Sequence, residues 1–157
     1  MPIKANAPDA KLDAFLDDGI LQLRRSRITK VLADHLAWLE SEGKVGARAD
    51  LCGANLVGLD LSGANLRCAD LSGANLAYSS LADADLGASD LTGANLQDAD
   101  LRGADLRRAY LDGADLRRAD LRGTRVFRFS LDAAYLEDAL LDELLDDPVP
   151  AIALRFA

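Results

Sequence analysis

Residues 54–76 read ANLVGLDLSGANLRCADLSGANL, and residues 99–121 read ADLRGADLRRAYLDGADLRRADL. Both stretches repeat a unit of five residues, in which a leucine follows Asp or Asn and a small residue, usually Ala, stands two places before the leucine. The repeated leucines are Leu51, Leu56, Leu61, Leu66, Leu71, Leu76, Leu81, Leu86, Leu91, Leu96, Leu101, Leu106, Leu111, Leu116 and Leu121. The same register continues with Val126, Leu131, Leu136 and Leu141. An internal repeat of this regularity is the first feature that a fold must explain.

The five-residue spacing excludes both an α-helix and an ordinary strand as the repeating element. On a helix with about 3.6 residues per turn, steps of five residues scatter the leucines around the whole cylinder. On a strand, whose side chains alternate between two faces, an odd step sends successive leucines to opposite faces. The pattern is satisfied when the chain turns a corner in every repeat, so that all the leucines point to one axis. We therefore predict that the repeated leucines form a narrow, dry core.

Glycine recurs two residues after many of the leucines, where a tight corner needs backbone freedom. These glycines are Gly53, Gly58, Gly63, Gly73, Gly93, Gly103, Gly113 and Gly123. The residue before each leucine adds a second period, because Asn prevails at positions 55, 65, 75 and 95 and Asp at positions 50, 60, 70, 90 and 100. An alternation of ten residues fits a four-sided coil whose opposite sides look alike, but it does not by itself fix twenty residues per turn.

The quoted segments resemble the pentapeptide repeat family, whose consensus is A(D/N)LXX. The resemblance covers residues 49–128 and implies an all-β solenoid, a right-handed quadrilateral β-helix of about four coils. With about 4.8 Å between stacked strands, four coils make a rod on the order of 20 Å long. We expect the loss of regularity near the end of the repeats to mark a modified last coil. The departures at the small-residue position are Leu59, Ser79, Ser89, Thr124 and Phe129.

Residues 1–48 are predicted to form a helical segment that caps a repeat domain over residues 49–134. Apolar residues from 28 to 39 fall on one helical stripe, and Gly43 is expected to close this helix. The stripe consists of Ile28, Val31, Leu32, His35, Leu36 and Leu39. An earlier stretch with Leu12, Phe15, Leu16 and Leu23 indicates another helix, which is broken near Gly19. Two helices would then lie across the first coil and cover the open end of the solenoid.

Residues 135–157 are predicted to form a C-terminal helix and an apolar tail. Apolar side chains between Tyr135 and Asp147 are consistent with a helix that Pro148 would end. The tail, residues 149–157, reads VPAIALRFA and is too apolar to remain unpacked. It either covers the last coil or contacts a second copy of the chain. The family resemblance implies that the second arrangement is available, because related proteins dimerise through C-terminal helices, and both monomer and homodimer stay open.

Composition limits the classes of function that the chain can have. The net charge of -8 over 157 residues argues against direct nucleic-acid binding, which needs a basic surface. We expect no membrane contact, since the sequence shows neither a signal-peptide stretch nor a run of about 18 apolar residues. Cys52 and Cys68 have neither redox nor zinc-site spacing, so we expect free thiols in a cytoplasmic protein. His35 and Trp38 are predicted to pack in the helical cap, and no catalytic residue, cofactor or metal is expected.

Outward charges define the candidate interaction surface. If a coil holds twenty residues, Asp50, Asp70 and Asp90 form one acidic column without local cations, which Asp112 and Asp132 extend. Farther along, Asp and Arg flank an inward leucine and are expected to pair in Asp100–Arg102, Asp105–Arg107, Asp115–Arg117 and Asp120–Arg122. Residues 49–98 hold seven Asp and one Arg, whereas residues 99–128 hold eight Arg and five Asp. The candidate interaction residues are Asp50, Asp70, Asp90, Arg102, Arg108, Arg122 and Arg128.

These features predict a non-catalytic scaffold whose outer walls contact a protein partner. The resemblance also implies an alternative, because some pentapeptide repeat proteins mimic duplex DNA, bind type II topoisomerases such as gyrase and protect them from quinolones. Such mimics are acidic along their length. The Arg-rich second half of this repeat domain fits that role less well.

Overall fold

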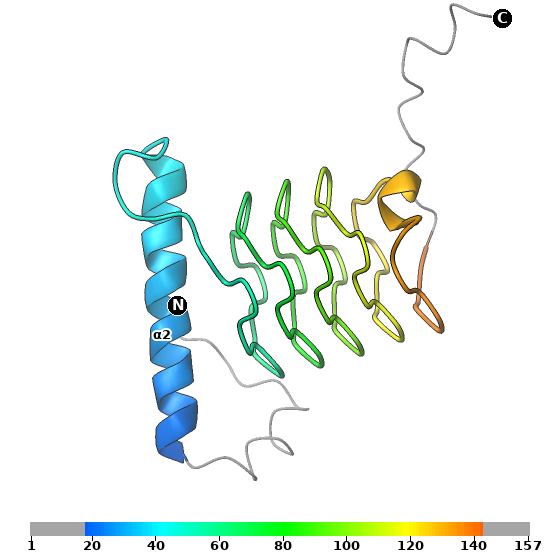
Figure 1. The fold of residues 1–157 in the computed structure, drawn as a ribbon, viewed down its shortest axis with the longest axis horizontal. Coiled ribbons are helices and arrows are strands. Elements are labelled where there is room, and N and C mark those ends of the chain that lie inside the picture. The colour runs from blue at the N-terminus through cyan, green and yellow to red at the C-terminus, as the bar shows by residue number, and fades with distance from the viewer. Residues whose placement is uncertain (1–17, 143–157) are drawn as a thin grey trace, which may run out of the picture.

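A helix and a stack of coils make up the described part of the chain (Figure 1). The structure, a computed structural model, describes residues 18–142, with side chains from residue 25 onward. Helix α2 spans Asp18–Glu40, and the short 3-10 helix η1 spans Arg128–Leu131. Figure 1 shows α2 lying across the N-terminal end of the stack and η1 within its last coil.

Each coil contains twenty residues, which settles the question that the ten-residue alternation left open. Every parallel bridge among the described residues joins residues twenty positions apart, as Asp50 joins Asp70. The bridges form four columns that begin at Asp50, Asn55, Asp60 and Asn65. We call these columns, together with the outward residues beside them, walls 1, 2, 3 and 4. Throughout residues 18–142 the bridges stay isolated instead of merging into longer strands, because the chain turns a corner every five residues.

The repeated leucines fill the interior of the coils. All fifteen are buried and none is more than 5% exposed, while Val126 and Leu131 extend the buried series. Burial of a leucine contributes about 1.5 to 3 kcal/mol, and here each coil shares that burial with its neighbours. Ser79 and Ser89, which replace Ala, are also buried, and each hydroxyl donates to the carbonyl three residues earlier at 2.7 Å. These two departures therefore leave no unsatisfied hydroxyl in the core.

The corners explain the recurrence of glycine. The eight glycines predicted to form corners all have φ between 62° and 71°. The same corner position is left-handed where a residue with a side chain occupies it, as at Ala88 with φ 55° and Arg108 with φ 62°. The coil imposes this conformation on any residue, and glycine adopts it at the lowest cost.

Asp and Asn before the leucines have a structural role that the sequence analysis missed. The Oδ1 atom of Asp90 accepts a hydrogen bond from the backbone N–H of Thr92 at 2.9 Å. Asn55 and Asn75 accept the same bond from the N–H two residues further on, at 3.3 and 3.2 Å. Because either side chain supplies the acceptor oxygen of this turn, the repeat tolerates both Asp and Asn.

Helix α2 is continuous from Asp18 to Glu40, and Gly19 lies at its N-terminal end. Helix α2 begins at Asp18, so Leu23 lies in the same helix as Ile28. A glycine beside the start of a helix interrupts few hydrogen bonds, and its cost of about 1 kcal/mol does not end the helix. The other positions of the predicted earlier helix, residues 12, 15 and 16, lie outside the described residues.

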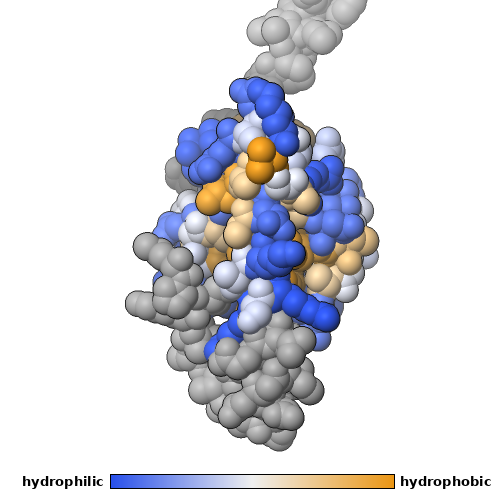
Figure 2. All heavy atoms as spheres, turned by 90° about the vertical axis from the view of Figure 1, so that its left-hand side faces the viewer, coloured by the Kyte–Doolittle hydropathy of each residue, from blue (hydrophilic) through white to orange (hydrophobic). Residues whose placement is uncertain are grey.

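One face of α2 packs on the first coil. Ile28 is buried in the same core cluster as the leucines, and Val31 and Leu32 pack against that cluster. Leu36, which the sequence placed on the apolar stripe, is 43% exposed. Figure 2 views the molecule from this end and shows polar side chains running along the outer face of the helix. Within residues 18–142, no helix has the length and apolar character needed to cross a membrane.

The C-terminal end of α2 is closed at Gly43, as predicted. The N–H of Gly43 donates to the carbonyl of Trp38 at 2.8 Å, and the N–H of Glu42 donates to the carbonyl of Leu39 at 3.3 Å. This pair of bonds forms a Schellman motif, in which the left-handed residue is Glu42 with φ 55°. Gly43 follows it with φ 85°.

The predicted helix over residues 135–147 is wrong in its first part. Tyr135 bridges to Asp115 and Leu140 bridges to Asp120, so residues 135–140 continue walls 2 and 3 as a partial fifth coil. The five-residue repeat persists here, and stacking on the preceding coil supplies hydrogen bonds that an isolated helix would have to replace. The remainder of that predicted helix, Pro148 and the apolar tail lie outside the described residues.

Candidate interaction surface

The predicted acidic column of Asp50, Asp70 and Asp90 is present on wall 1 and has a cation near it. Bridges join Asp50 to Asp70 and Asp70 to Asp90, and the next residue in the column is Tyr110. Hydrogen bonds from Ser72, including one of 2.7 Å from its hydroxyl, lower the pKa of Asp70, and Arg48 lowers that pKa further. The prediction of a strip without local cations therefore overlooked Arg48, which precedes the first repeat.

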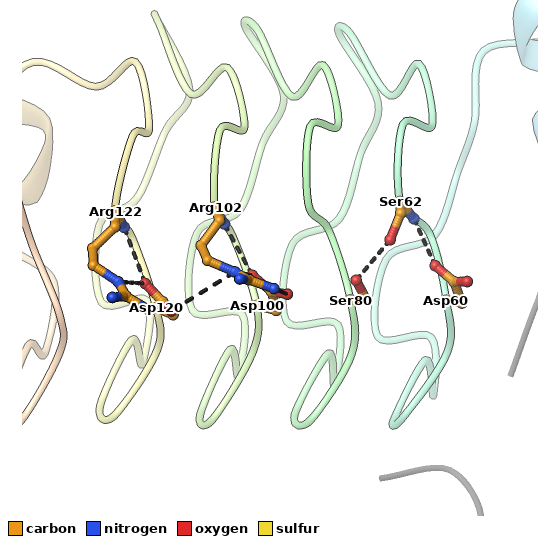
Figure 3. A network of polar contacts seen from close by, with 7 residues as sticks. All are labelled: Asp60, Ser62, Ser80, Asp100, Arg102, Asp120 and Arg122. Carbon is orange, nitrogen blue, oxygen red and sulfur yellow. Dashed lines mark hydrogen bonds and ion pairs between the residues drawn. The ribbon is translucent and has the colours of Figure 1, made fainter. Parts of the chain in front are cut away.

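The predicted Asp–Arg pairs are present and form ladders along the walls. On wall 3, the guanidinium of Arg102 donates to both carboxylate oxygens of Asp100 at 2.8 and 2.6 Å. Arg122 binds Asp120 in the same way at 2.9 and 2.6 Å, and a 3.8 Å contact between Arg102 and Asp120 links the two coils (Figure 3). Hydrogen bonds from these arginines lower the pKa of Asp100 and of Asp120.

The ladder on wall 3 begins in the third coil, and in the first coil of the same wall Asp60 lies beside Ser62 instead of an arginine. In the first two coils, Ser62 occupies the repeat position of the arginines and Ser80 occupies that of the aspartates. Their hydroxyl oxygens lie 2.6 Å apart (Figure 3). The equivalent pairs Asp105–Arg107 and Asp115–Arg117 lie on walls 4 and 2, at 2.5 and 2.6 Å. Bidentate pairing holds these arginines in fixed orientations and neutralises most of their charge. Arg102 and Arg122 are therefore poor candidates for recruiting an acidic partner.

Arg108 and Arg128 lie at the corner between walls 4 and 1 and differ from the ladder arginines. Both side chains are exposed. Neither has an ion-pair partner among residues 25–142. Their guanidinium groups therefore keep their donors available for another molecule.

Exposed aromatic side chains gather at the C-terminal end of the stack, and the sequence analysis did not select them. Tyr110, Phe129 and Tyr135 are 61%, 57% and 58% exposed. The ring of Phe129 stacks on that of Phe127, with centroids 6.0 Å apart and planes 6° from parallel. We call Tyr110, Phe129, Tyr135, Arg108 and Arg128 the C-terminal aromatic surface.

A sequence signal for this surface was available. Tyr110 and Tyr135 occupy the outward position at which most repeats have Asp or Asn, as their bridges to Asp90 and Asp115 show. Phe129 stands at the inward Ala position, and the modified coil with η1 turns it outward. An aromatic residue cannot supply the acceptor oxygen of the Asx turn, so its presence at that position gives up a structural hydrogen bond.

His35 is a packing residue at the contact between α2 and the first coil. The imidazole is fully buried, its Nδ1 atom accepts the N–H of Ala49 at 3.0 Å, and the ring stacks on Trp38 with centroids 5.8 Å apart. Nε2 makes no hydrogen bond of good geometry with any residue that the structure describes, although the nearby carbonyl of Arg67 favours the protonated ring. Burial outweighs that contribution and lowers the pKa of His35. The ring is therefore neutral at pH 7.

The described residues offer no metal centre. No group of three or more His, Cys, Asp or Glu side chains between residues 25 and 142 is placed to hold a metal ion. Cys52 is exposed, Cys68 is half-buried, and both are free thiols.

Comparison with known proteins identifies relatives of the repeat. A family model described as Pentapeptide repeats matches residues 47–77, 69–108 and 89–126, in eight copies. The crystal structure of Rfr23, a pentapeptide repeat protein from the cyanobacterium Cyanothece 51142, is 33% identical over 67% of this chain and 69% of that one, with a TM-score of 0.51. A pentapeptide repeat protein from Nostoc PCC 7120 is 35% identical over 61% of this chain and 83% of that one, with a TM-score of 0.36.

A trypsin-treated form of QnrB1, a plasmid-mediated fluoroquinolone resistance protein, is 20% identical over 62% of this chain and 60% of that one, with a TM-score of 0.31. Identity this low says nothing about a shared partner. No curated protein matches the chain.

Proposed function

Because the chain belongs to the pentapeptide repeat family, we propose that it is a non-catalytic interaction scaffold that presents its C-terminal aromatic surface to a protein partner. Proteins of this family fold as right-handed quadrilateral β-helices and are generally not enzymes. The proposal assigns the contact to one end of the solenoid instead of to the charged walls as a whole.

The observation that carries this proposal is the exposure of three aromatic side chains near two arginines that have no ion-pair partner among the described residues. Tyr110, Phe129 and Tyr135 are each more than half exposed. Tyrosine, other aromatic residues and arginine are the residue types most enriched where binding energy concentrates in protein interfaces. A rigid solenoid holds them at fixed positions, so that binding requires little ordering of the surface.

The dry core supports a role on the outside of the molecule. The leucines leave no room for a ligand along the axis, since most of them are 0% exposed. The Asp residues on the walls accept hydrogen bonds from the backbone and from arginine, which lowers the pKa of Asp100, Asp105 and Asp120 and keeps them ionised. A general acid at neutral pH needs a raised pKa instead. We expect the protein to act in the cytoplasm, where Cys52 and Cys68 remain reduced.

The proposal predicts that the partner is lost when the aromatic side chains are removed. Full-length wild-type chain and a Tyr110→Ser/Phe129→Ser variant are immobilised and exposed to extract of the source organism. Proteins retained are compared by quantitative mass spectrometry. Tyr78→Ser is the matched control, because Tyr78 is another exposed tyrosine, 48% exposed, on a corner of the second coil. Retention of the same proteins by all three chains, each shown by its melting curve to be folded, would rule out this surface.

A second copy of the chain is the other candidate partner, because residues 135–157 were predicted to provide a homodimer contact. Light scattering over a range of concentrations separates monomer from dimer. A dimer that dissociates in the Tyr110→Ser/Phe129→Ser variant would place the self-contact on this surface.

Gyrase remains the alternative partner implied by family resemblance. The acidic column Asp50, Asp70 and Asp90 favours it, whereas Tyr110 ends that column and the Asp–Arg ladders neutralise the walls beyond it. A supercoiling assay tests this alternative directly. Inhibition at low micromolar protein that is lost on neutralising the three aspartates would favour DNA mimicry over the aromatic surface.

A further inference from the structure

Wall 4 contains a cavity of about 290 Å³ whose lining includes three arginines and a phenylalanine. The arginines are Arg67, Arg107 and Arg108, and Phe127 lines the C-terminal side of the cavity. We propose that this cavity is a binding site for a phosphomonoester carried next to a flat ring. The site stands whether or not the C-terminal aromatic surface binds a protein.

The cavity exists because one outward side chain is missing. Along wall 4, the position after the inward residue is occupied in successive coils by Arg67, Gly87, Arg107 and Phe127. Gly87 lacks the positive φ found at the corner glycines, so the backbone does not require glycine there. A Cβ atom at this position would lie 3.1 Å from Nη1 of Arg67 and 3.0 Å from Oδ1 of Asp85. Glycine therefore leaves a gap one coil wide in a column of long side chains.

Cations outnumber anions around this gap. Asp105 is held by Arg107 at 2.5 Å and lies 3.9 Å from Arg125, while Asp85 lies 3.7 Å from Arg67. The contact of 3.7 Å is too long for a strong hydrogen bond, so Arg67 can turn toward a ligand. Arg107 binds Asp105 through Nε and Nη2.

Arg108 supplies the uncompensated charge of the site. It has no ion-pair partner in the described part of the chain, and its side chain is exposed at the rim of the cavity. Two carboxylates facing four guanidinium groups leave a positive site on a chain whose net charge is -8. The free donors of Arg67, Arg107 and Arg108 thus favour an anion.

The chemistry of the lining favours phosphate over a single carboxylate. A phosphomonoester carries about 1.5 to 2 negative charges at pH 7 and offers three acceptor oxygens, which suits several guanidinium groups at once. Phe127 is half-buried and is held by its stacking on Phe129, so it offers a fixed flat wall to a ring. The volume lies just below the range of about 300 to 1,000 Å³ for small-molecule pockets, which limits the occupant to one small ligand or one side chain.

Phenyl phosphate is the probe that tests the site, because it joins the two groups in the smallest molecule. Titration of the full-length chain by calorimetry and by NMR is expected to show saturable binding that is weaker with inorganic phosphate or with benzoate. Gly87→Leu fills the gap and is expected to weaken binding by about tenfold or more. Ala82→Leu is its matched control, since Ala82 occupies the same repeat position on wall 3 of the same coil.

Charge reversal provides a second test that does not depend on filling the cavity. Arg108→Glu is expected to weaken phenyl phosphate binding by about tenfold or more. Lys30 is an exposed residue of α2, and Lys30→Glu changes the net charge by the same amount as Arg108→Glu. This control variant is expected to leave phenyl phosphate binding unchanged. An equal loss of phenyl phosphate binding in Arg108→Glu and Lys30→Glu would show that only the net charge matters and would overturn the proposal. Unchanged binding in folded Gly87→Leu and Arg108→Glu variants would also overturn it.

The source of the phosphomonoester is separated by two further probes. Adenosine monophosphate represents a free nucleotide, and a peptide containing phosphotyrosine represents a modified partner protein. Binding of either that is lost in Arg108→Glu supports the site and identifies the source. Failure of phenyl phosphate, adenosine monophosphate and the phosphopeptide to bind the wild-type chain overturns it, and leaves the proposed protein contact at Tyr110 and Phe129 untouched.

Discussion

Replacing a corner glycine with alanine isolates the cost of the left-handed corner. Gly73 has φ 62°, and a Cβ atom added to it would meet nothing within 4 Å. The change Gly73→Ala therefore creates no clash and adds only backbone strain, of about 1 to 2 kcal/mol. Alanine also restricts the unfolded chain, which offsets about 0.4 to 1 kcal/mol of that strain. We expect the free energy of unfolding to fall by about 1 kcal/mol.

The matched control is Gly87→Ala, at a glycine whose φ is not positive. Its added Cβ atom would meet only the ends of the Asp85 and Arg67 side chains, at 3.0 and 3.1 Å, and both can move. We expect this variant to be at least as stable as wild type. Urea unfolding followed by circular dichroism measures both values. Equal destabilisation of the two variants, or none in Gly73→Ala, would show that corner geometry is not what selects glycine.

The other predictions concern the core, the cap and the contact between α2 and the loop after it. Leu91→Asp should prevent cooperative folding, because it places an unpaired charge in the dry core at a cost of several kcal/mol. Asp90→Asn should change stability by less than about 0.5 kcal/mol, because Asn supplies the same acceptor oxygen. Far-UV circular dichroism and thermal melts compare the two variants. The pKa of His35 is lowered in the folded protein, so neutral His35 contributes fully to stability above the unfolded pKa of about 6.5. This contribution to stability is lost as pH falls toward the folded pKa, since protonation breaks the hydrogen bond from the N–H of Ala49. The stability difference between wild type and His35→Gln should therefore shrink from pH 8 to pH 5, and a difference independent of pH would contradict this. Gly46→Ala would place a Cβ atom 2.1 Å from a backbone oxygen of α2, so it should loosen the helix and lower stability by about 1 to 3 kcal/mol, as amide exchange in α2 would report.

The spacing of the leucines predicted the coil because it marks one buried position and the exposed positions around it in every repeat. Steps of five residues leave one arrangement in which every leucine is buried, and Leu66, Leu86 and Leu106 lie one above another as that arrangement requires. Twenty residues per turn needed the bridges, because the Asp and Asn alternation of ten residues is equally compatible with other even numbers of sides.

The errors arose where one pattern had two physical causes. Leucines at positions 136, 140, 141, 144 and 145 fit a helical stripe, but Leu136 also belongs to the five-residue register, and stacking on wall 2 decides in favour of the coil. Asp90 was interpreted as a surface charge, although its carboxylate also closes a turn. Whether a repeated polar residue serves the fold or a partner cannot be read from its recurrence.

The candidate surface was predicted in part for a similar reason. Arg108 and Arg128 stood out by charge and have no ion-pair partner between residues 25 and 142, whereas Arg102 and Arg122 stood out on the same ground and are bound by neighbouring aspartates. Tyr110 is uncharged, so the charge pattern of the sequence does not indicate it. An aromatic residue that displaces the turn-forming side chain was the stronger signal.

Because each coil holds twenty residues, the number of residues between two positions determines the angle between them around the axis of the solenoid. Each repeat advances the backbone by one quarter of a turn, so inserting or deleting five residues rotates everything downstream to the adjacent side, while a change of twenty residues alters only the length. Evolution can therefore move Tyr110 from one side of the rod to the next without altering a single side chain around it. Two such proteins could share every residue of a binding motif and still face their partners in perpendicular directions.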